Sequence, residues 1–167
     1  MAYKNKTYVA FDGDNDIRYY NLMKAWKQND NSNFNFFDAH DINNALDSST
    51  EETIKKRLRE RMANSKVFVL LVGESTRYLY KFVRWEIEQA IKRELPIIVV
   101  NLNNKKSCDN DLCPALAKNT LAIHIPFSSK IMQYALENWP QYHEQYKREN
   151  KTGAFYYKDD VYKSLGI

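Results

Sequence analysis

Short apolar runs recur along the chain, and most of them are rich in β-branched or aromatic side chains. They cover residues 7–11, 34–37, 67–72, 96–102 and 121–125. Runs of this length and composition, bounded by polar or turn-forming residues, are typical of β-strands. The run at 67–72 contains no polar residue, which predicts a central strand that is buried on both faces of its sheet.

Between the predicted strands, apolar residues recur at the three- and four-residue spacing of amphipathic helices. The first such stripe consists of Tyr19, Leu22, Met23 and Trp26. Asp14 or Asn15 is suited to cap this helix. Ser49 and Glu52 form a capping-box pattern at the start of a second helix that ends near residue 64. Further helices are predicted at about 79–94 and 128–146.

Strands and helices alternate along the chain, and such alternation favours a parallel sheet. We therefore predict an α/β fold with a parallel sheet of about five strands and helices on both faces. A polar stretch at 103–119 leaves room for a short fourth helix or for none. With 167 residues, 44% of them hydrophobic, the chain has the size of one domain. We assign residues 1–147 to this domain and 148–167 to a C-terminal tail that packs on it or extends from it.

The composition argues against several classes of protein. The apolar runs are far shorter than the roughly 20 residues of a membrane-spanning helix, and the polar amino terminus lacks a signal peptide. We therefore expect a cytoplasmic protein that does not enter a membrane. The net charge of +4 is small, and the basic run at 55–61 is interrupted by Leu58 and Glu60. Such a run is more often a solvated helix face than a nucleic-acid site, so no nucleic-acid partner is expected.

Two cysteines, Cys108 and Cys113, lie in the polar stretch at 103–119. In a chain without a secretion signal, we expect them to be reduced thiols. Together with Asp109, Asp111 and the distant His124 they could be imagined as a metal site. The spacing fits no zinc pattern, however, so no metal is predicted.

Polar residues directly follow several of the predicted strands. In open parallel sheets, ligands bind in the crevice beyond the carboxyl ends of the strands. The residues expected at this edge are Phe11, Asp12, Asp14, Asp38, Gly73, Glu74, Ser75, Asn101 and Asn103. Each of them taken singly is more often a cap or turn residue than a functional one. The glycine-rich signatures of dehydrogenases and P-loop enzymes are missing, as is the G-x-S-x-G elbow of hydrolases.

One carboxylate of the predicted helix at 79–94 lies on an unexpected face. Advancing each residue by about 100° around the axis defines an apolar face of Val83, Ile87, Ala90 and Ile91, flanked by Phe82. Glu86 projects inside this apolar arc. Desolvation there tends to raise the pKa of a carboxyl group, which makes Glu86 a candidate functional residue. An ion pair, or a side chain that reaches solvent along the helix edge, explains the pattern equally well.

Three parts of the chain carry a family resemblance. They are Y-V-A-F-D-G-D-N-D at 8–16, F-F-D at 36–38, and V-L-L-V-G-E-S-T with F-V-R-W-E-I-E-Q-A-I within 69–91. Together they resemble the bacterial TIR-like family, which includes the TIR-like subunit of Thoeris antiphage systems. The resemblance covers roughly residues 5–127, and the Trp-Glu-Ile helix after a buried strand is its most specific part.

The resemblance implies a flavodoxin-like sheet and NAD as substrate rather than as a bound cofactor. It implies cleavage of the nicotinamide–ribose bond, with Glu86 as the catalytic carboxylate. Phe11 would stack on an NAD ring, and Asp12 and Asp38 would lie near the ribose or the loop, with Ser75 and Asn103 as further binding residues. The product would be ADP-ribose or a related second messenger that reaches a downstream effector by diffusion. Self-association would complete the site, as is common among TIR enzymes.

Two other functions compete with this interpretation. Many TIR enzymes have a serine in the first strand and a Trp-Cys pair ahead of the glutamate, where this chain has Ala10, Phe82 and Val83. A non-catalytic module that recruits partners through the loop at 39–48 and the adjacent helix faces is therefore the alternative. A phosphoacceptor receiver domain is disfavoured, because the strand at 67–72 is followed by Gly-Glu-Ser where a receiver needs an aspartate.

Overall fold

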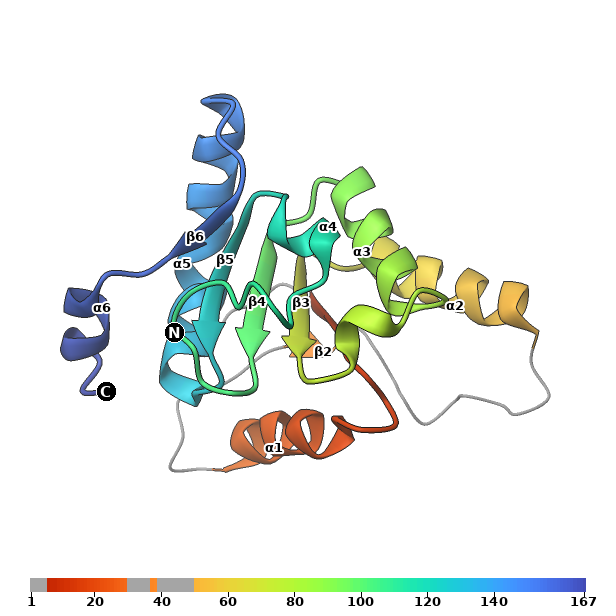
Figure 1. The fold of residues 1–167 in the computed structure, drawn as a ribbon, viewed down its shortest axis with the longest axis horizontal. Coiled ribbons are helices and arrows are strands. Elements are labelled where there is room, and N and C mark those ends of the chain that lie inside the picture. The colour runs from red at the N-terminus through yellow and green to blue at the C-terminus, as the bar shows by residue number, and fades with distance from the viewer. Residues whose placement is uncertain (1–5, 30–36, 39–49) are drawn as a thin grey trace.

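A computed structural model of the chain describes residues 6–29 and 50–167, together with the backbone of residues 37–38 (Figure 1). The elements, in order, are β1 (Lys6–Ala10), α1 (Ile17–Gln28), β2 (Phe37–Asp38), α2 (Glu51–Ala63), β3 (Val67–Val72), the 3₁₀ turn η2 (Thr76–Tyr78), α3 (Val83–Lys92), β4 (Ile97–Asn101), α4 (Ala115–Lys118), β5 (Ala122–Pro126), α5 (Ser129–Arg148), β6 (Ala154–Tyr156) and α6 (Asp159–Ser164).

The strands form one parallel sheet in the order β2-β1-β3-β4-β5-β6. The predicted α/β fold is therefore confirmed. All six residues of β3 are buried, and the strand lies between β1 and β4, as its unbroken apolar sequence predicted. The chain moves outward from β1 to β2 and then returns to the other side of β1 to form β3. The order of strands thus reverses between β1 and β3, where open α/β sheets bind their ligands.

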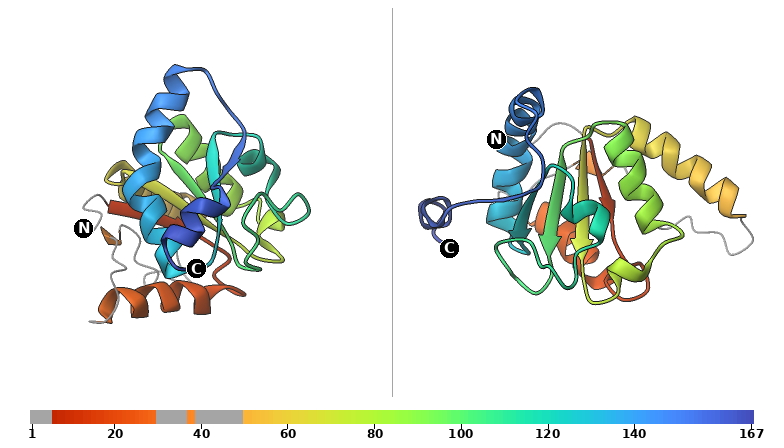
Figure 2. Two further views of the ribbon diagram at one scale, coloured as in Figure 1. Left: turned by 90° about the vertical axis from the view of Figure 1, so that its left-hand side faces the viewer. Right: turned by 45° about the horizontal axis from the view of Figure 1, so that its top comes forward.

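Helices cover both faces of the sheet, and each face has its own core. Side chains of α1, α5 and α6 pack on one face, against alternate strand residues such as Val9 and Val69. The residues between them, such as Tyr8 and Phe68, point to the other face, where α2, α3 and α4 pack. The right-hand view of Figure 2 shows α5 and α3 on opposite sides of the strands.

Two helix caps differ from the prediction. The cap position of α1 is Asp16 instead of Asp14 or Asn15, whose backbone N–H groups instead donate to the carboxylate of Asp12. The turn that follows β1 therefore extends one or two residues further than the pattern indicated. The cap of α2 is Thr50, whose hydroxyl accepts from the N–H of Thr53 at 3.2 Å. The predicted cap Ser49 lies outside the described residues.

One other predicted helix is shorter in the structure. The helix predicted from residue 79 begins at Val83, because η2 and a turn occupy the residues before it. Within the polar stretch at 103–119, α4 has four residues, in line with the expected short helix.

The C-terminal segment contains a strand that the sequence pattern did not reveal. β6 pairs with β5 in parallel, Ala122 opposite Ala154 and His124 opposite Tyr156, and so extends the sheet to six strands. Phe155 stacks on Tyr146 of α5 at 4.8 Å between ring centroids. None of the helices in the described ranges combines the length and apolar character needed to cross a lipid bilayer.

Candidate functional site

Glu86 lies in the first turn of α3, where its side chain points into the core between α3 and the sheet. Only 5% of the residue is exposed, so its predicted position inside the apolar arc is confirmed. The hydroxyl of Tyr8, on β1, donates a short hydrogen bond to Glu86 Oε2. Tyr8 is itself fully buried and stacks on Phe68 of β3 at 5.7 Å. A carboxyl group and a phenol thus share one apolar compartment.

The surroundings of Glu86 favour its protonated form. Burial raises the pKa of Glu86 to about 7, although the hydrogen bond from Tyr8 opposes this shift. Burial, followed by the nearby Glu86 charge, in turn raises the pKa of Tyr8 well above its ordinary value. The carboxyl group is therefore poised to gain or lose a proton near neutral pH, as general acids and bases are.

Neither an ion pair nor access to solvent explains the position of Glu86 among the described residues. No lysine or arginine in the described part of the chain forms an ion pair with Glu86, and the side chain does not reach solvent. Glu88 on the same helix behaves as a surface charge should: it is half-exposed and pairs with Arg84 at 3.3 Å. A desolvated and unpaired carboxyl group is more typical of a functional site than of a structural one.

A cavity of about 550 Å³ lies at the carboxyl ends of β1, β3 and β4, where the strand order reverses. We call it the rim cavity. It is lined by Asn15, Asp16, Arg18, Tyr19, Val72, Gly73, Glu74, Ser75, Leu102, Asn103 and Leu112. Its carboxylates and amides can accept hydrogen bonds from ligand hydroxyl groups, and Arg18 contributes a positive charge.

Asp16 is the most enclosed charged group of the rim cavity. Burial raises the pKa of Asp16, and the neighbouring carboxylate of Asp12 raises it further. Its carboxylate lies so close to Gly73 that a Cβ atom at position 73 would overlap it. A larger residue at position 73 would therefore have to displace the Asp16 side chain. The φ angle of Gly73 itself is unexceptional.

The side chains of Phe11 and Asp12, which were predicted to contact NAD, make contacts within the turn that follows β1. Phe11 is half-buried and stacks on Tyr20 of α1, with 4.9 Å between the ring centroids. Asp12 is buried and accepts from the N–H groups of Asp14 and Asn15 and from the Asn15 side chain at 2.8 Å. Both side chains therefore hold the turn between β1 and α1, and neither lines the rim cavity.

Ser75 and Asn103 do line the rim cavity, as their predicted position at the strand ends requires. The side chain of Asn103 donates to Asp109 Oδ2 at 2.8 Å and accepts from the N–H of Lys105. Asp38 does not reach this edge in the described part of β2: it lies opposite Thr7, which in turn lies opposite Val67 at the start of β3. The side chain of Asp38 is outside the described part of the structure. The structure thus brings Ser75 and Asn103 together and separates both from Glu86, which lies on the α3 side of the sheet.

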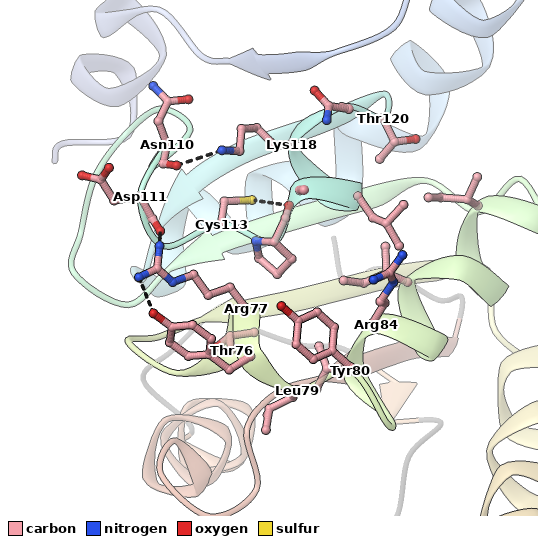
Figure 3. A pocket seen from close by; sticks show the side chains of 18 residues that line it. Thr76, Arg77, Leu79, Tyr80, Arg84, Asn110, Asp111, Cys113, Lys118 and Thr120 are labelled. Carbon is pink, nitrogen blue, oxygen red and sulfur yellow. Dashed lines mark hydrogen bonds between the residues drawn. The ribbon is translucent and has the colours of Figure 1, made fainter.

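A larger cavity of about 820 Å³ lies between α3 and α4 (Figure 3). Val83 and Ile87 contribute to its apolar wall. Arg77 closes one side by donating to the backbone carbonyl of Asp111, and its guanidinium also donates to Tyr78 at 2.6 Å. Glu86 projects from a different side of α3 and lines neither this cavity nor the rim cavity.

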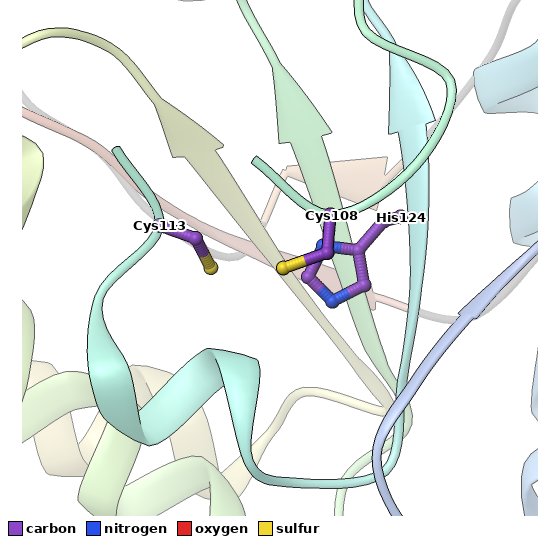
Figure 4. Close-up of side chains that lie close together, drawn as sticks. All are labelled: Cys108, Cys113 and His124. Carbon is purple, nitrogen blue, oxygen red and sulfur yellow. The ribbon is translucent and has the colours of Figure 1, made fainter. Parts of the chain in front are cut away.

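Two cysteines and a histidine gather beneath the loop that joins β4 to α4. The Sγ atoms of Cys108 and Cys113 and a ring nitrogen of His124 lie within 4.8 Å of one another (Figure 4). Burial lowers the pKa of His124 to about 4 and raises the pKa of the Cys113 thiol to about 12. Both cysteines are free thiols. The sequence analysis named these three residues together but predicted no metal, because His124 reaches the cysteines from β5 and the spacing fits no zinc pattern.

Comparison with protein families places these features in context. The family model described as Thoeris protein ThsB, TIR-like domain, matches residues 8–107, more than half of the chain. The chain belongs to this family. The match contains Tyr8, Glu86 and most of the rim cavity. Membership links this TIR-like domain to Thoeris-type TIR signalling, as the sequence resemblance predicted.

Sequence reasoning missed two residues of this TIR-like domain that shape the candidate site. Tyr8 was treated as one residue of an apolar strand, although a phenol in a buried strand needs a hydrogen-bond partner. That requirement could have directed attention to the unpaired carboxylate on α3. Asp16 follows β1 and Gly73 follows β3, so their contact joins loops that follow different strands. No local pattern reveals such a contact.

Proposed function

We propose that this TIR-like domain cleaves the nicotinamide–ribose bond of NAD, with Glu86 as the catalytic carboxylate. The observation that carries the proposal is the state of Glu86: it is buried in an apolar compartment, it has no ion-pair partner among the described residues, and its pKa is raised to about 7. A family of TIR-like domains associated with Thoeris signalling makes NAD the natural substrate class to test.

The reaction needs a group that stabilises positive charge and accepts a proton. When the bond between ribose C1′ and the nicotinamide nitrogen breaks, its electron pair leaves with nicotinamide, which becomes neutral. The ribose is left with oxocarbenium character, which a nearby carboxylate stabilises. Water or another nucleophile then bonds to C1′ and releases a proton, which Glu86 is suited to accept because its pKa lies near neutrality. Water as nucleophile gives ADP-ribose, and a group of the substrate itself gives a cyclic product.

Tyr8 would influence the ionisation of this carboxylate before substrate binds. Its hydroxyl donates to Glu86 Oε2 and so favours the ionised form that the reaction requires. Ser75 and Asn103 remain candidate binding residues because both line the rim cavity. Phe11 and Asp12 line neither cavity and are therefore not included. Contact with Asp38 and completion of the site by self-association remain predictions.

The test is NAD cleavage by the purified protein, with and without extract of phage-infected cells, followed by mass spectrometry of the nucleotides. Glu86→Gln keeps the side-chain volume and removes the charge, so the rate should fall about a hundredfold or more. Glu88→Gln is the matched control, because it removes an exposed carboxylate from the same helix. It should cleave NAD at the wild-type rate. Equal loss in both variants, or none in either, would contradict the role of Glu86.

A second candidate function is a non-catalytic TIR interaction module. One observation favours it: Glu86 lines neither the rim cavity nor the cavity between α3 and α4. The loop at 39–48, through which such a module was predicted to recruit partners, lies outside the described residues. In this case NAD would remain intact under every condition, and Glu86→Gln would alter stability without affecting any nucleotide.

A further inference from the structure

The cluster of Cys108, Cys113 and His124 joins two parts of the chain that are distant in sequence. The cysteines belong to the loop at 102–114, and His124 lies in the middle of β5. Figure 4 shows both sulfur atoms and the imidazole ring on the same side of the strands, beneath the loop. Cys113 and His124 are buried, whereas Cys108 is partly exposed and provides access from solvent.

His124 gives an independent sign that something is bound there. The residue is fully buried, and neither ring nitrogen has a hydrogen-bond partner among the described residues. An imidazole without partners in the interior loses the hydrogen bonds that it would make with water, which is destabilising. Native proteins usually avoid this loss. A metal ion bound to one ring nitrogen would replace a lost hydrogen bond with a stronger interaction.

The arrangement of the three groups is close to that of a metal site. With Zn–S bonds of about 2.3 Å and Zn–N bonds of about 2.0 Å at tetrahedral angles, sulfur atoms lie about 3.8 Å apart and sulfur and nitrogen about 3.5 Å apart. The three ligand atoms already lie within 4.8 Å of one another, so small movements of the side chains suffice. Two thiolates and an imidazole are ligands that select zinc over magnesium or calcium.

The nearest carboxylate does not compete for this role. Asp109 lies between the two cysteines in sequence, but its oxygens accept hydrogen bonds from the N–H groups of Asp111 and Leu112 and from Asn103. Two cysteines and one histidine therefore leave the fourth position of a tetrahedral ion to water.

We propose that Cys108, Cys113 and His124 bind one Zn²⁺ ion, which fastens the loop at 102–114 to β5. The same loop contributes Asn103 and Leu112 to the rim cavity, so the ion would fix one wall of that cavity. This site is independent of NAD cleavage and is expected whether or not the domain is an enzyme. The alternative to zinc binding is a disulfide between Cys108 and Cys113.

The experiment uses the full chain, purified without chelator under anaerobic conditions. Elemental analysis should find about one zinc ion per chain, and the metal-free protein titrated with Co²⁺ should develop the charge-transfer absorption of thiolate-bound cobalt. Zn²⁺ should raise the melting temperature, and a chelator should reverse the effect. Cys108→Ser, at a partly exposed position, and His124→Leu should each weaken Co²⁺ binding at least tenfold.

His143→Gln is the matched control, because His143 is also a buried histidine but lies on α5. It should bind Co²⁺ with wild-type affinity. The proposal is overturned if the reduced protein shows no thiolate–cobalt absorption, or if Cys108→Ser binds as tightly as wild type. Intact mass and thiol trapping of the anaerobic protein then show whether Cys108 and Cys113 are free thiols. A disulfide between them would also overturn the proposal. If His124→Leu does not fold, Cys108→Ser still decides the result.

Discussion

Glu86 and Asp109 are buried to nearly the same extent, with 5% and 3% of each residue exposed, yet their surroundings act in opposite directions. Burial raises the pKa of Glu86 to about 7, and the hydroxyl of Tyr8 opposes it only in part. Burial also acts to raise the pKa of Asp109, but there it is outweighed and the pKa is lowered.

Glu86 lies deeper in the protein than Asp109, and the number of donors that each carboxylate meets adds to the difference in pKa. Asp109 accepts from the N–H groups of Asp111 and Leu112 at 3.0 and 2.9 Å, and from the Asn103 side chain at 2.8 Å. The ammonium group of Lys105 lies 3.6 Å away. Together these groups favour the ionised form, so Asp109 serves to hold its loop. Burial by itself therefore does not mark a functional carboxylate, whereas burial without compensating donors does.

The largest expected effect concerns the stability of Glu86→Gln. In the folded protein the pKa of Glu86 lies above its ordinary value of 4.5, so ionisation as the pH rises from about 4.5 to about 7 reduces stability. Glutamine cannot ionise and avoids this loss. At pH 8 the variant should be more stable than wild type by on the order of 2–3 kcal/mol, or roughly 5 °C in melting temperature.

Thermal unfolding of both proteins between pH 4.5 and pH 8 checks this prediction. The gap between them should narrow steadily as the pH falls, because wild-type Glu86 becomes protonated in the folded state and then in the unfolded state as well. A Glu86→Gln protein that is less stable than wild type at pH 8 would show that the carboxylate has a cationic partner.

Asp109→Asn should lower the stability of the protein, by somewhat less than Glu86→Gln raises it. The new side-chain NH₂ would face groups that are themselves donors, Asn103 Nδ2 and Lys105, so buried hydrogen bonds would be lost. We expect a loss of about 1–3 kcal/mol and a lower melting temperature. Asp111→Asn, at an exposed position in the same loop, is the control and should change stability by less than about 0.5 kcal/mol. If the two variants melt together, the hydrogen bonds of Asp109 contribute little.

Tyr8→Phe should have the smallest effect of the three substitutions. We expect this effect on the pKa of Glu86 in particular. Its hydroxyl lowers the pKa of Glu86, so its removal should leave the effect of burial unopposed and raise that pKa. In the pH profile of kcat/KM for NAD cleavage, the acidic limb should move upward by about half a pH unit to one unit. An unchanged limb, with the variant folded as judged by circular dichroism, would mean that the limb reports another group.

Local sequence patterns predicted the parts of the fold that depend on one segment at a time. The apolar run of β3 and the helical spacing around Glu86 each reflect a face that must be buried, and such faces can be recognised within a dozen residues. The first turn of α1 was placed wrongly because Asp12 holds Asp14 and Asn15 in a preceding turn. Several residues there are suitable caps, and periodicity does not choose among them.

The missed features depend on contacts between distant segments. Tyr8 meets Glu86 across 78 positions of sequence, and His124 joins two cysteines that precede it by more than ten residues. β6 has three residues, too few to show a period, and its place in the sheet depends on pairing with β5. Such features follow from the packing of elements and not from the elements themselves.

The pairing of β6 with β5 also bears on how separate copies of the domain behave. Without residues 153–156, the β5 backbone groups that pair with β6 would face solvent, among them the N–H of Ala122 that donates to Gly153. An open strand of this kind is a template for joining a strand of another molecule. On this side of the sheet the outer strand is β6, which is only three residues long and offers a poor template. A chain shortened before residue 153 should therefore aggregate through β5, so the C-terminal segment protects the domain from edge-to-edge polymerisation.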